Sequence, residues 1–203
     1  MAEFIDFSAC IVSGGSSLAR RIEALHGSYS SMCAEYFNGL LHKHGRAFEE
    51  SACGFLLLDG LLQKHGINRA ELVISRGTDG RPDVINKNGL DFSISHSEGA
   101  AMCVLASGPD ALIGADIQRV REYSADKMVE LAEMFMGAED YMNFLKTEDE
   151  GLFYTLWTRR EAYLKRVGAD VFADTRDIDL NTENFRTGVI TACGKRYYYS
   201  ICT

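Results

Sequence analysis

The sequence predicts an α+β protein built of two α/β halves, and three observations support this. Helix-spaced apolar residues and short strand-like runs occur in both halves of the chain. The two prolines, Pro82 and Pro109, both lie in turn contexts, DGRPD and SGPDA. No low-complexity stretch or visible repeat interrupts the chain. We therefore expect an N-terminal half over residues 1–107 and a C-terminal half over residues 108–203, divided near the turn 107–110.

The N-terminal half is expected to be mostly helical before Pro82. Apolar residues at three- and four-residue spacing predict helices near 17–44 and 47–65, and ELVIS (71–75) predicts a short strand. DFSIS (91–95) and AAMCVLA (100–106) then predict two strands, joined by the polar loop HSEG.

The C-terminal half is expected to begin with a strand, ALIGADI (111–117). Helical spacing predicts helices near 124–134, 138–147 and 150–167. The tail VITACGKRYYYSIC (189–202) predicts a hairpin that turns at Gly194-Lys195.

Composition excludes several classes of function. The net charge of −8 argues against a general nucleic-acid binder. No run of 18 or more apolar residues predicts a membrane span, and the first residues lack the basic and apolar regions of a signal peptide. Six cysteines without CxxC spacing fit reduced thiols rather than disulfides or a zinc site. We therefore expect a cytoplasmic protein.

The segment FYTLWTRREAYLKRVG (153–168) predicts a helix with a charge on its apolar side. At about 100° per residue, its apolar side chains share an arc of roughly 140°, and Arg160 falls near the centre of that arc. A buried guanidinium needs an anionic partner or a wet cleft. Two interpretations follow: an internal salt bridge or outward snorkelling, or a cleft in which Arg160 and Lys165 bind an anion such as phosphate.

The strand IGADIQ (113–118) supplies an acid that could complement this helix. Strand alternation puts Gly114, Asp116 and Gln118 on one face, and Gly114 is expected to leave open space beside Asp116. With Glu161 from the helix, these oxygens make a sparse site of the kind that magnesium accepts, since it completes its shell with water and phosphate. Taken alone, an aspartate such as Asp116 is more often an ordinary acid at a strand end than a metal ligand.

A third candidate group is FSISHS (92–97), where Ser95, His96 and Ser97 are expected at a strand-to-loop exit. Such exits often contact ligands, although a single histidine is more often a hydrogen-bonded structural residue.

Taken together and in order, four segments resemble the signature blocks of the 4′-phosphopantetheinyl transferases. The segments are RGTDGRP (76–82), FSISHS, IGADIQ and FYTLWTRREAYLKRVG. The family's blocks are a GKP turn, F-N-x-S-H-S, G-I-D-I-E and W-x-x-K-E-[AS]-x-x-K-x-x-G. The resemblance covers residues 70 to 170 and is to the larger, surfactin-synthetase type, in which two similar halves form a pseudo-dimer within one chain. It implies a monomer.

The resemblance implies an enzyme that transfers the phosphopantetheine arm of coenzyme A to a serine of an apo carrier protein. The carrier would be an acyl, polyketide or peptidyl carrier, and adenosine 3′,5′-bisphosphate would be released. Asp116, Gln118 and Glu161 would face Mg²⁺, with Glu161 also the base, directly or through a metal-bound water. The coenzyme phosphates would contact Ser95, His96, Arg160 and Lys165. Arg81 and Pro82 would border the adenine, and Glu139 resembles a further acid of the family.

Three departures from the family's blocks bear on this assignment. Gln118 stands where many members have an acid, which removes one negative charge. Glu49 and Glu50 lie in a helix that usually carries basic residues, so the 3′-phosphate would depend on the neighbouring segment HKHGR (42–46) instead. Arg160 replaces the usual lysine, which changes the geometry of a phosphate contact but not its charge.

Two other functions remain compatible with the sequence. The chain could be a non-catalytic module that binds coenzyme A or a carrier protein, with Gln118 as the trace of a lost metal site. It could also be a metal-dependent phosphohydrolase that uses water in place of serine. Coenzyme binding without turnover would favour the first, and release of adenosine bisphosphate without a carrier would favour the second.

Overall fold

The computed structural model describes residues 3–12, 17–77, 81–86, 89–169, 176 and 178–203. It is an α+β protein that divides into two compact units, Met1–Ile113 and Gly114–Thr203. The units are called unit 1 and unit 2 below, and each is described by itself. In the described part of the chain, no helix combines the length and apolar character needed to cross a bilayer.

Unit 1 contains an antiparallel three-stranded sheet in the order β1-β5-β4. Its strands are β1 (Phe4–Ile11), β4 (Leu90–Ser97) and β5 (Ala100–Ser107). The central strand β5 is buried along its whole length, as its apolar sequence requires. A second, two-stranded sheet joins β2 (Ile74–Arg76) to β3 (Pro82–Val84).

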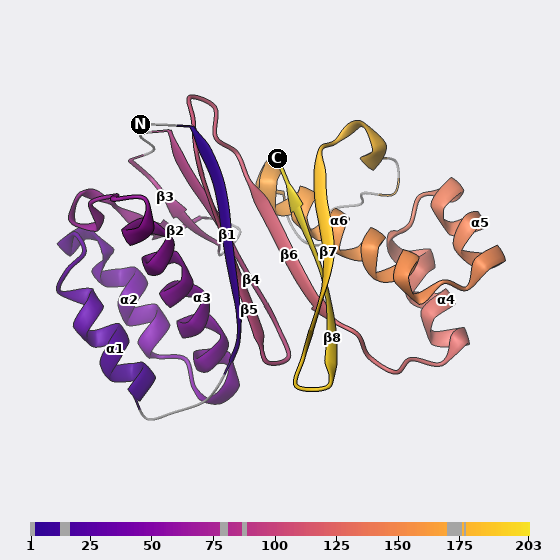
Figure 1. Cartoon of the computed structure of the whole chain (residues 1–203), viewed down its shortest axis with the longest axis horizontal. Coiled ribbons are helices and arrows are strands. Elements are labelled where there is room, and N and C mark those ends of the chain that lie inside the picture. The colour runs from indigo at the N-terminus through magenta and orange to yellow at the C-terminus, as the bar shows by residue number, and fades with distance from the viewer. Residues whose placement is uncertain (1–2, 13–16, 78–80, 87–88, 170–175, 177) are drawn as a thin grey trace. The chain divides into compact units, whose positions relative to one another are not determined.

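Three helices accompany this sheet: α1 (Ser17–His26), α2 (Ala34–Leu41) and α3 (Gly45–Lys64). Helix α3 packs on all three strands of the main sheet, and α1 and α2 pack on α3 (Figure 1). The core between them contains an aromatic cluster of Tyr29, Tyr36, Phe37 and Phe55. Two single-turn 3₁₀ helices, η1 (Ser31–Cys33) and η2 (Arg69–Glu71), complete the unit.

The helices expected near 17–44 and 47–65 are confirmed, since α1 and α2 lie in the first range and α3 covers the second. Strand β1, which pairs with β5, was not predicted. One expectation for unit 1 is wrong, because the loop between β4 and β5 is shorter than HSEG. His96 and Ser97 remain in β4, and the turn consists of Glu98 and Gly99, which both have positive φ, 39° and 98°. Positive φ at both turn residues is typical of the type I′ turn of a two-residue hairpin.

Unit 2 contains an antiparallel sheet in the order β6-β8-β7. Its strands are β6 (Gly114–Arg119), β7 (Phe185–Ala192) and β8 (Lys195–Cys202). The hairpin expected in the tail is present, but its turn lies one position earlier than expected, at Cys193 and Gly194, which have φ of 50° and 70°. The expected strand 111–117 begins later, at Gly114.

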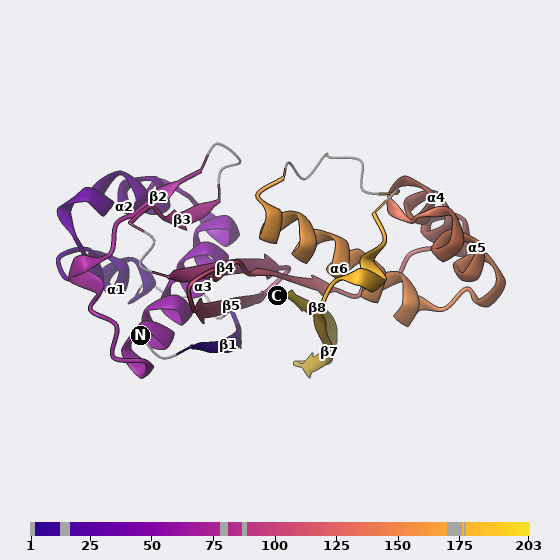
Figure 2. The same cartoon turned by 90° about the horizontal axis from the view of Figure 1, so that it is seen from above.

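The helices of unit 2 are α4 (Ala125–Phe135), α5 (Ala138–Thr147) and α6 (Glu150–Val167), with the 3₁₀ helix η3 (Leu180–Thr182). Helix α6 packs on β6 and β8 (Figure 2) and also contacts α4. Asp149 caps its start by accepting a hydrogen bond from the Gly151 N–H at 2.7 Å, and Gly168 ends it with φ of 66°. The three helices predicted for this half are therefore confirmed within a residue or two.

Candidate active site

Strand β6 and helix α6 are in backbone contact at Gly114. A Cβ placed on Gly114 would lie 1.8 Å from the Ala162 carbonyl oxygen and 2.5 Å from the Arg166 backbone nitrogen. The expectation of open space beside Asp116 at this glycine is therefore wrong, because the backbone of α6 fills it. Glycine is needed here so that the helix can lie directly on the strand.

Asp116 lies two residues further along the same face of β6 and is only 6% exposed. Its Oδ1 accepts a hydrogen bond from Lys165 Nζ of α6 at 2.6 Å, which forms a salt bridge. A buried carboxylate needs such a partner to remain charged. The close packing at Gly114 is what brings these two side chains together.

Glu161 is half-buried on α6, one turn before Lys165. Burial raises the pKa of its carboxyl group above the ordinary value, and the negative charge of Asp116 raises it further. The positive charge of Lys165 acts in the opposite direction on this pKa. Asp116, Glu161 and Lys165 thus form one electrostatic group, which we call the β6–α6 charge cluster.

Gln118 belongs to the same face of β6 and is half-buried. It lies opposite Tyr198 of β8, whose ring stacks on Tyr154 of α6 with 5.6 Å between centroids. Its part in metal binding stays a prediction. Among the residues the structure describes, no group of three or more His, Cys, Asp and Glu side chains could hold a metal ion.

Sequence reasoning missed a set of buried hydroxyl groups near this cluster. Ser200 of β8 lies opposite Asp116 and is fully buried. Its Oγ is 2.8 Å from Thr158 Oγ1 and 3.1 Å from Thr187 Oγ1, and Arg159 Nε donates to Thr187 Oγ1 at 3.3 Å. The spacing of Thr158, Glu161 and Lys165 on α6 was the available signal, since residues three and four apart share a helix face.

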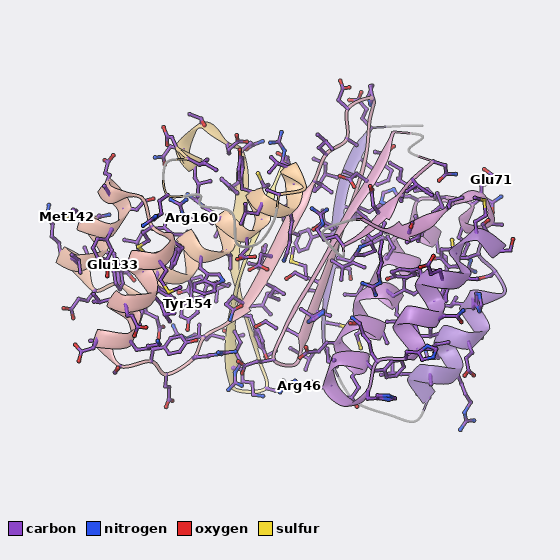
Figure 3. All side chains as sticks on the ribbon, turned by 180° about the vertical axis from the view of Figure 1, so that it is seen from behind. Arg46, Glu71, Glu133, Met142, Tyr154 and Arg160 are labelled. Atoms are coloured by element: carbon purple, nitrogen blue, oxygen red, sulfur yellow. The ribbon has the colours of Figure 1, made fainter. Side chains whose placement is uncertain are left out.

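Arg160, which is labelled in Figure 3, extends from α6. It is buried, as the helical arc predicted, with 3% exposure. Its Nη2 lies 3.9 Å from Asp140 Oδ2. Both residues line a pocket of about 290 Å³ with Glu139 and with residues of segment 176–181. Burial raises the pKa of Asp140, an effect that the Arg160 charge opposes. This is the internal ion pair considered above as one interpretation, and a phosphate contact of Arg160 stays a prediction.

The remaining predicted site residues belong to unit 1. Ser95 is buried on β4, and His96, next along the strand, is exposed. Pro82 begins β3, and the carbonyl of Arg81 accepts a hydrogen bond from the Gly77 N–H at 2.7 Å. Residues 78–80 of the block RGTDGRP lie outside the described residues. The roles of these four side chains toward a coenzyme stay predictions.

The basic segment 42–46 is engaged in local contacts. Lys43 Nζ donates to Ser51 Oγ at 2.6 Å, and Arg46 Nε donates to Glu50 Oε1 at 2.9 Å. His42 Nδ1 lies 2.7 Å from the Asn38 carbonyl oxygen. Burial lowers the pKa of Lys43, and the nearby charge of Arg76 lowers it further. Two cations held this close together are typical of a site that could accept an anion.

Comparison with known proteins assigns the part of the chain that holds the β6–α6 charge cluster. The model of the 4′-phosphopantetheinyl transferase superfamily matches residues 112–203. The 4′-phosphopantetheinyl transferase HetI of Nostoc sp. is 33% identical over 109 residues, which is 52% of this chain and 44% of HetI.

Two further relatives are similar over a comparable part of the chain. The 4′-phosphopantetheinyl transferase Sfp of Bacillus subtilis is 28% identical over 109 residues, 52% of this chain and 46% of Sfp. The L-aminoadipate-semialdehyde dehydrogenase-phosphopantetheinyl transferase of Saccharomyces cerevisiae is 28% identical over 125 residues, 59% of this chain and 46% of that protein. The chain thus spans about half the length of the curated relatives it matches.

Proposed function

We propose that this protein, whose residues 112–203 match the model of the 4′-phosphopantetheinyl transferase superfamily, transfers 4′-phosphopantetheine from coenzyme A to a serine of an apo carrier protein. The observation that carries the proposal is the β6–α6 charge cluster, in which two carboxylates and a lysine gather within the matched region. The relatives' names support the reaction class, since they are called phosphopantetheinyl transferases.

The donor set of the cluster fits a magnesium ion. Asp116 and Glu161 are close enough for the charge of one to raise the pKa of the other, which is an arrangement that a divalent cation would stabilise. Magnesium accepts as few as one or two protein carboxylates. Asp116 and Glu161 would hold the ion, with the Gln118 amide oxygen beside them. When bound, it would supply Lewis-acid stabilisation of charge on the pyrophosphate oxygens.

The residues of the chain would carry the other parts of the reaction. The serine hydroxyl oxygen of the carrier attacks the β-phosphorus, the bond from that phosphorus to the adenosine bisphosphate breaks, and the serine proton moves to Glu161. In the metal-free protein, burial and the charge of Asp116 raise the pKa of Glu161, which favours uptake of a proton by its carboxylate. The positive charge of Lys165 would stabilise the phosphoryl oxygens as negative charge develops on them.

The resemblance also implies coenzyme contacts for residues of unit 1. Ser95 and His96 would contact phosphates, and Arg81 and Pro82 would border the adenine, as the resemblance implies. For the 3′-phosphate we favour Lys43, because its ammonium group lies beside Ser51 and close to the charge of Arg76. Arg160, which pairs with Asp140 through Nη2, would add a phosphate contact through its other N–H groups.

The test is direct transfer to a panel of apo carrier proteins. Purified protein, coenzyme A and magnesium should give a mass gain on at least one carrier and an equal amount of adenosine 3′,5′-bisphosphate. Addition of EDTA should abolish both products. Coenzyme binding without any mass gain would identify a binding module instead, and release of the bisphosphate without a carrier would identify a phosphohydrolase.

A further inference from the structure

Glu50 of α3 is a buried carboxylate with three partners from different parts of unit 1. It is 8% exposed, and its Oε1 accepts hydrogen bonds from Arg46 Nε at 2.9 Å and from the Gly99 backbone N–H at 2.8 Å. Its Oε2 lies 3.1 Å from His96 Nδ1. A charge buried in this way is tolerated because its hydrogen-bonding capacity is used.

Close packing of α3 on β4 brings Glu50 to His96. Gly54 lies one turn after Glu50, and a Cβ at Gly54 would be 2.5 Å from Ile94 Cγ2. Ile94 and His96 are two residues apart and point to the same face of β4. Glu50 and Gly54, four residues apart on α3, therefore lie against His96 and Ile94, two residues apart on β4. The missing side chain of Gly54 allows the helix to approach the strand this closely.

The pairing determines the protonation and the orientation of the His96 ring. A carboxylate only accepts hydrogen bonds, so the Nδ1 that faces Glu50 must carry a proton. The other ring nitrogen, Nε2, lies on the side of the ring away from that bond. The His96 side chain is 37% exposed, so the ring is open to solvent on another side.

We propose that Glu50 is a positioning residue, which holds His96 by Nδ1 and so directs the opposite ring nitrogen, Nε2, toward a phosphate group of bound coenzyme A. The inference rests on the proposed function, in which His96 contacts a coenzyme phosphate. Phosphate oxygens accept hydrogen bonds, so Nε2 must donate, and the bound ring carries protons on both nitrogens and a positive charge. Glu50 stabilises that charge from behind while its bonds to Arg46 and Gly99 hold its own position.

A double-mutant cycle on coenzyme binding tests this coupling. The dissociation constant of coenzyme A is measured by calorimetry for wild type, Glu50→Gln, His96→Gln and the double variant. Loss of a charge-assisted contact should weaken binding about ten-fold in each single variant. Because Glu50 acts through His96, the double variant should bind no worse than His96→Gln. Independent, multiplying effects would overturn the proposal, and so would wild-type affinity in Glu50→Gln.

Glu49→Gln is the matched control, since Glu49 is the adjacent acid on α3 and is less buried. It should leave the affinity for coenzyme A unchanged. Thermal unfolding of each variant shows whether a loss of affinity reflects a loss of fold.

A spectroscopic readout keeps the inference separate from the proposed function. Long-range ¹H–¹⁵N NMR spectra of the histidine rings, assigned with His96→Gln, should show a proton on Nδ1 of His96 in the wild-type protein without ligand. An unprotonated Nδ1 would overturn the pairing. If the wild type binds coenzyme A but transfers nothing, the proposed function fails while the cycle still decides the role of Glu50. If the wild type binds no coenzyme A, the proposed function and the proposed role of Glu50 both fail. The spectrum then shows whether Glu50 and His96 form a hydrogen-bonded pair.

Discussion

At the scale of single residues, the ionised carboxylate of Glu161 lowers the stability of the metal-free protein and is also the proposed catalytic base. Its pKa in the folded protein is raised above the ordinary value of 4.5. The folded protein therefore holds this proton more tightly than the unfolded chain does. The contribution of this group to stability is full below pH 4.5 and is lost as the pH rises from there through the raised pKa. At neutral pH the ionised group destabilises the metal-free protein.

Replacement of Glu161 by Gln separates the two effects. Transfer activity should fall by at least about 100-fold, because the base is removed. The free energy of unfolding of the metal-free variant at neutral pH should equal or exceed that of wild type, and the advantage should vanish near pH 4. Turnover measured by carrier mass and denaturant unfolding at several pH values check these two outcomes.

Glu130→Gln serves as the control for this change, because Glu130 is an exposed acid on α4 that pairs with Lys127 at 2.8 Å. It should alter neither turnover nor the pH dependence of unfolding. Full activity of Glu161→Gln would remove Glu161 from the mechanism, and a marked loss of stability at neutral pH would show that its charge is well compensated.

At the scale of elements, the close contact of β6 and α6 depends on Gly114. The Gly114→Ala change should destabilise unit 2 by at least about 3 kcal/mol, since the new methyl group would overlap the helix backbone rather than a movable side chain. Loss of activity should accompany the loss of stability, because Asp116 and Lys165 would separate. Thermal unfolding and the yield of soluble protein measure the effect.

A second glycine gives the opposite expectation. Gly60 lies inside α3, and a Cβ there would meet nothing within 4 Å. Gly60→Ala should therefore stabilise the protein by about 0.5–1 kcal/mol, which is the usual gain of alanine over glycine in a helix. Equal effects of the two alanine substitutions would contradict the packing described for β6 and α6.

The helices and strands also show which parts of the fold local sequence patterns can predict. The three helices of unit 2 follow from helical spacing, which is local information. Strand β1 was missed because its stability comes from pairing with β5, about 100 residues away, which no local pattern reveals. The turn at Cys193–Gly194 was predicted one residue too late. A cysteine at positive φ is uncommon, and nothing in the sequence marks Cys193 as a turn residue.

The candidate site shows the same contrast between local patterns, which the sequence displays, and contacts between distant residues, which it does not. Helix and strand periodicity, together with the order of the four segments, singled out Asp116, Glu161 and Lys165, and the structure brings their charges together. An internal ion pair of Arg160 was one of two interpretations, but its partner Asp140 was not predicted, and neither was the pairing of Glu50 with His96. Both pairs join different elements, and the partner of a buried charge is chosen by packing that a single sequence does not display.

At the scale of the whole molecule, the net charge of −8 limits how an acidic carrier protein could be recruited. Two molecules of the same net sign gain no long-range attraction. Recognition of a carrier would then depend on short-range contacts, which salt screens less strongly. The coenzyme differs, because its phosphates would meet local cations such as Lys43 and Lys165.

Ionic strength should therefore affect the two substrates differently. Between roughly 0.05 and 0.5 M salt, the KM for the carrier should stay constant or fall, because screening reduces repulsion. The KM for coenzyme A should rise over the same range, because screening weakens its charge-assisted contacts. Steady-state kinetics with each substrate varied in turn checks both. A KM for the carrier that rises steeply with salt would indicate a dominant basic docking surface.

The direct contact between the Gly114 strand backbone and the Ala162 carbonyl has a further consequence for ion selectivity. Asp116 and Glu161 stand on the two main-chain segments that meet there, so the separation of these segments is fixed at that point. A fixed separation favours an ion that needs few protein donors. Calcium, with bonds near 2.3–2.6 Å and a preference for more oxygen donors, would fit it less well than magnesium, with bonds near 2.0–2.1 Å.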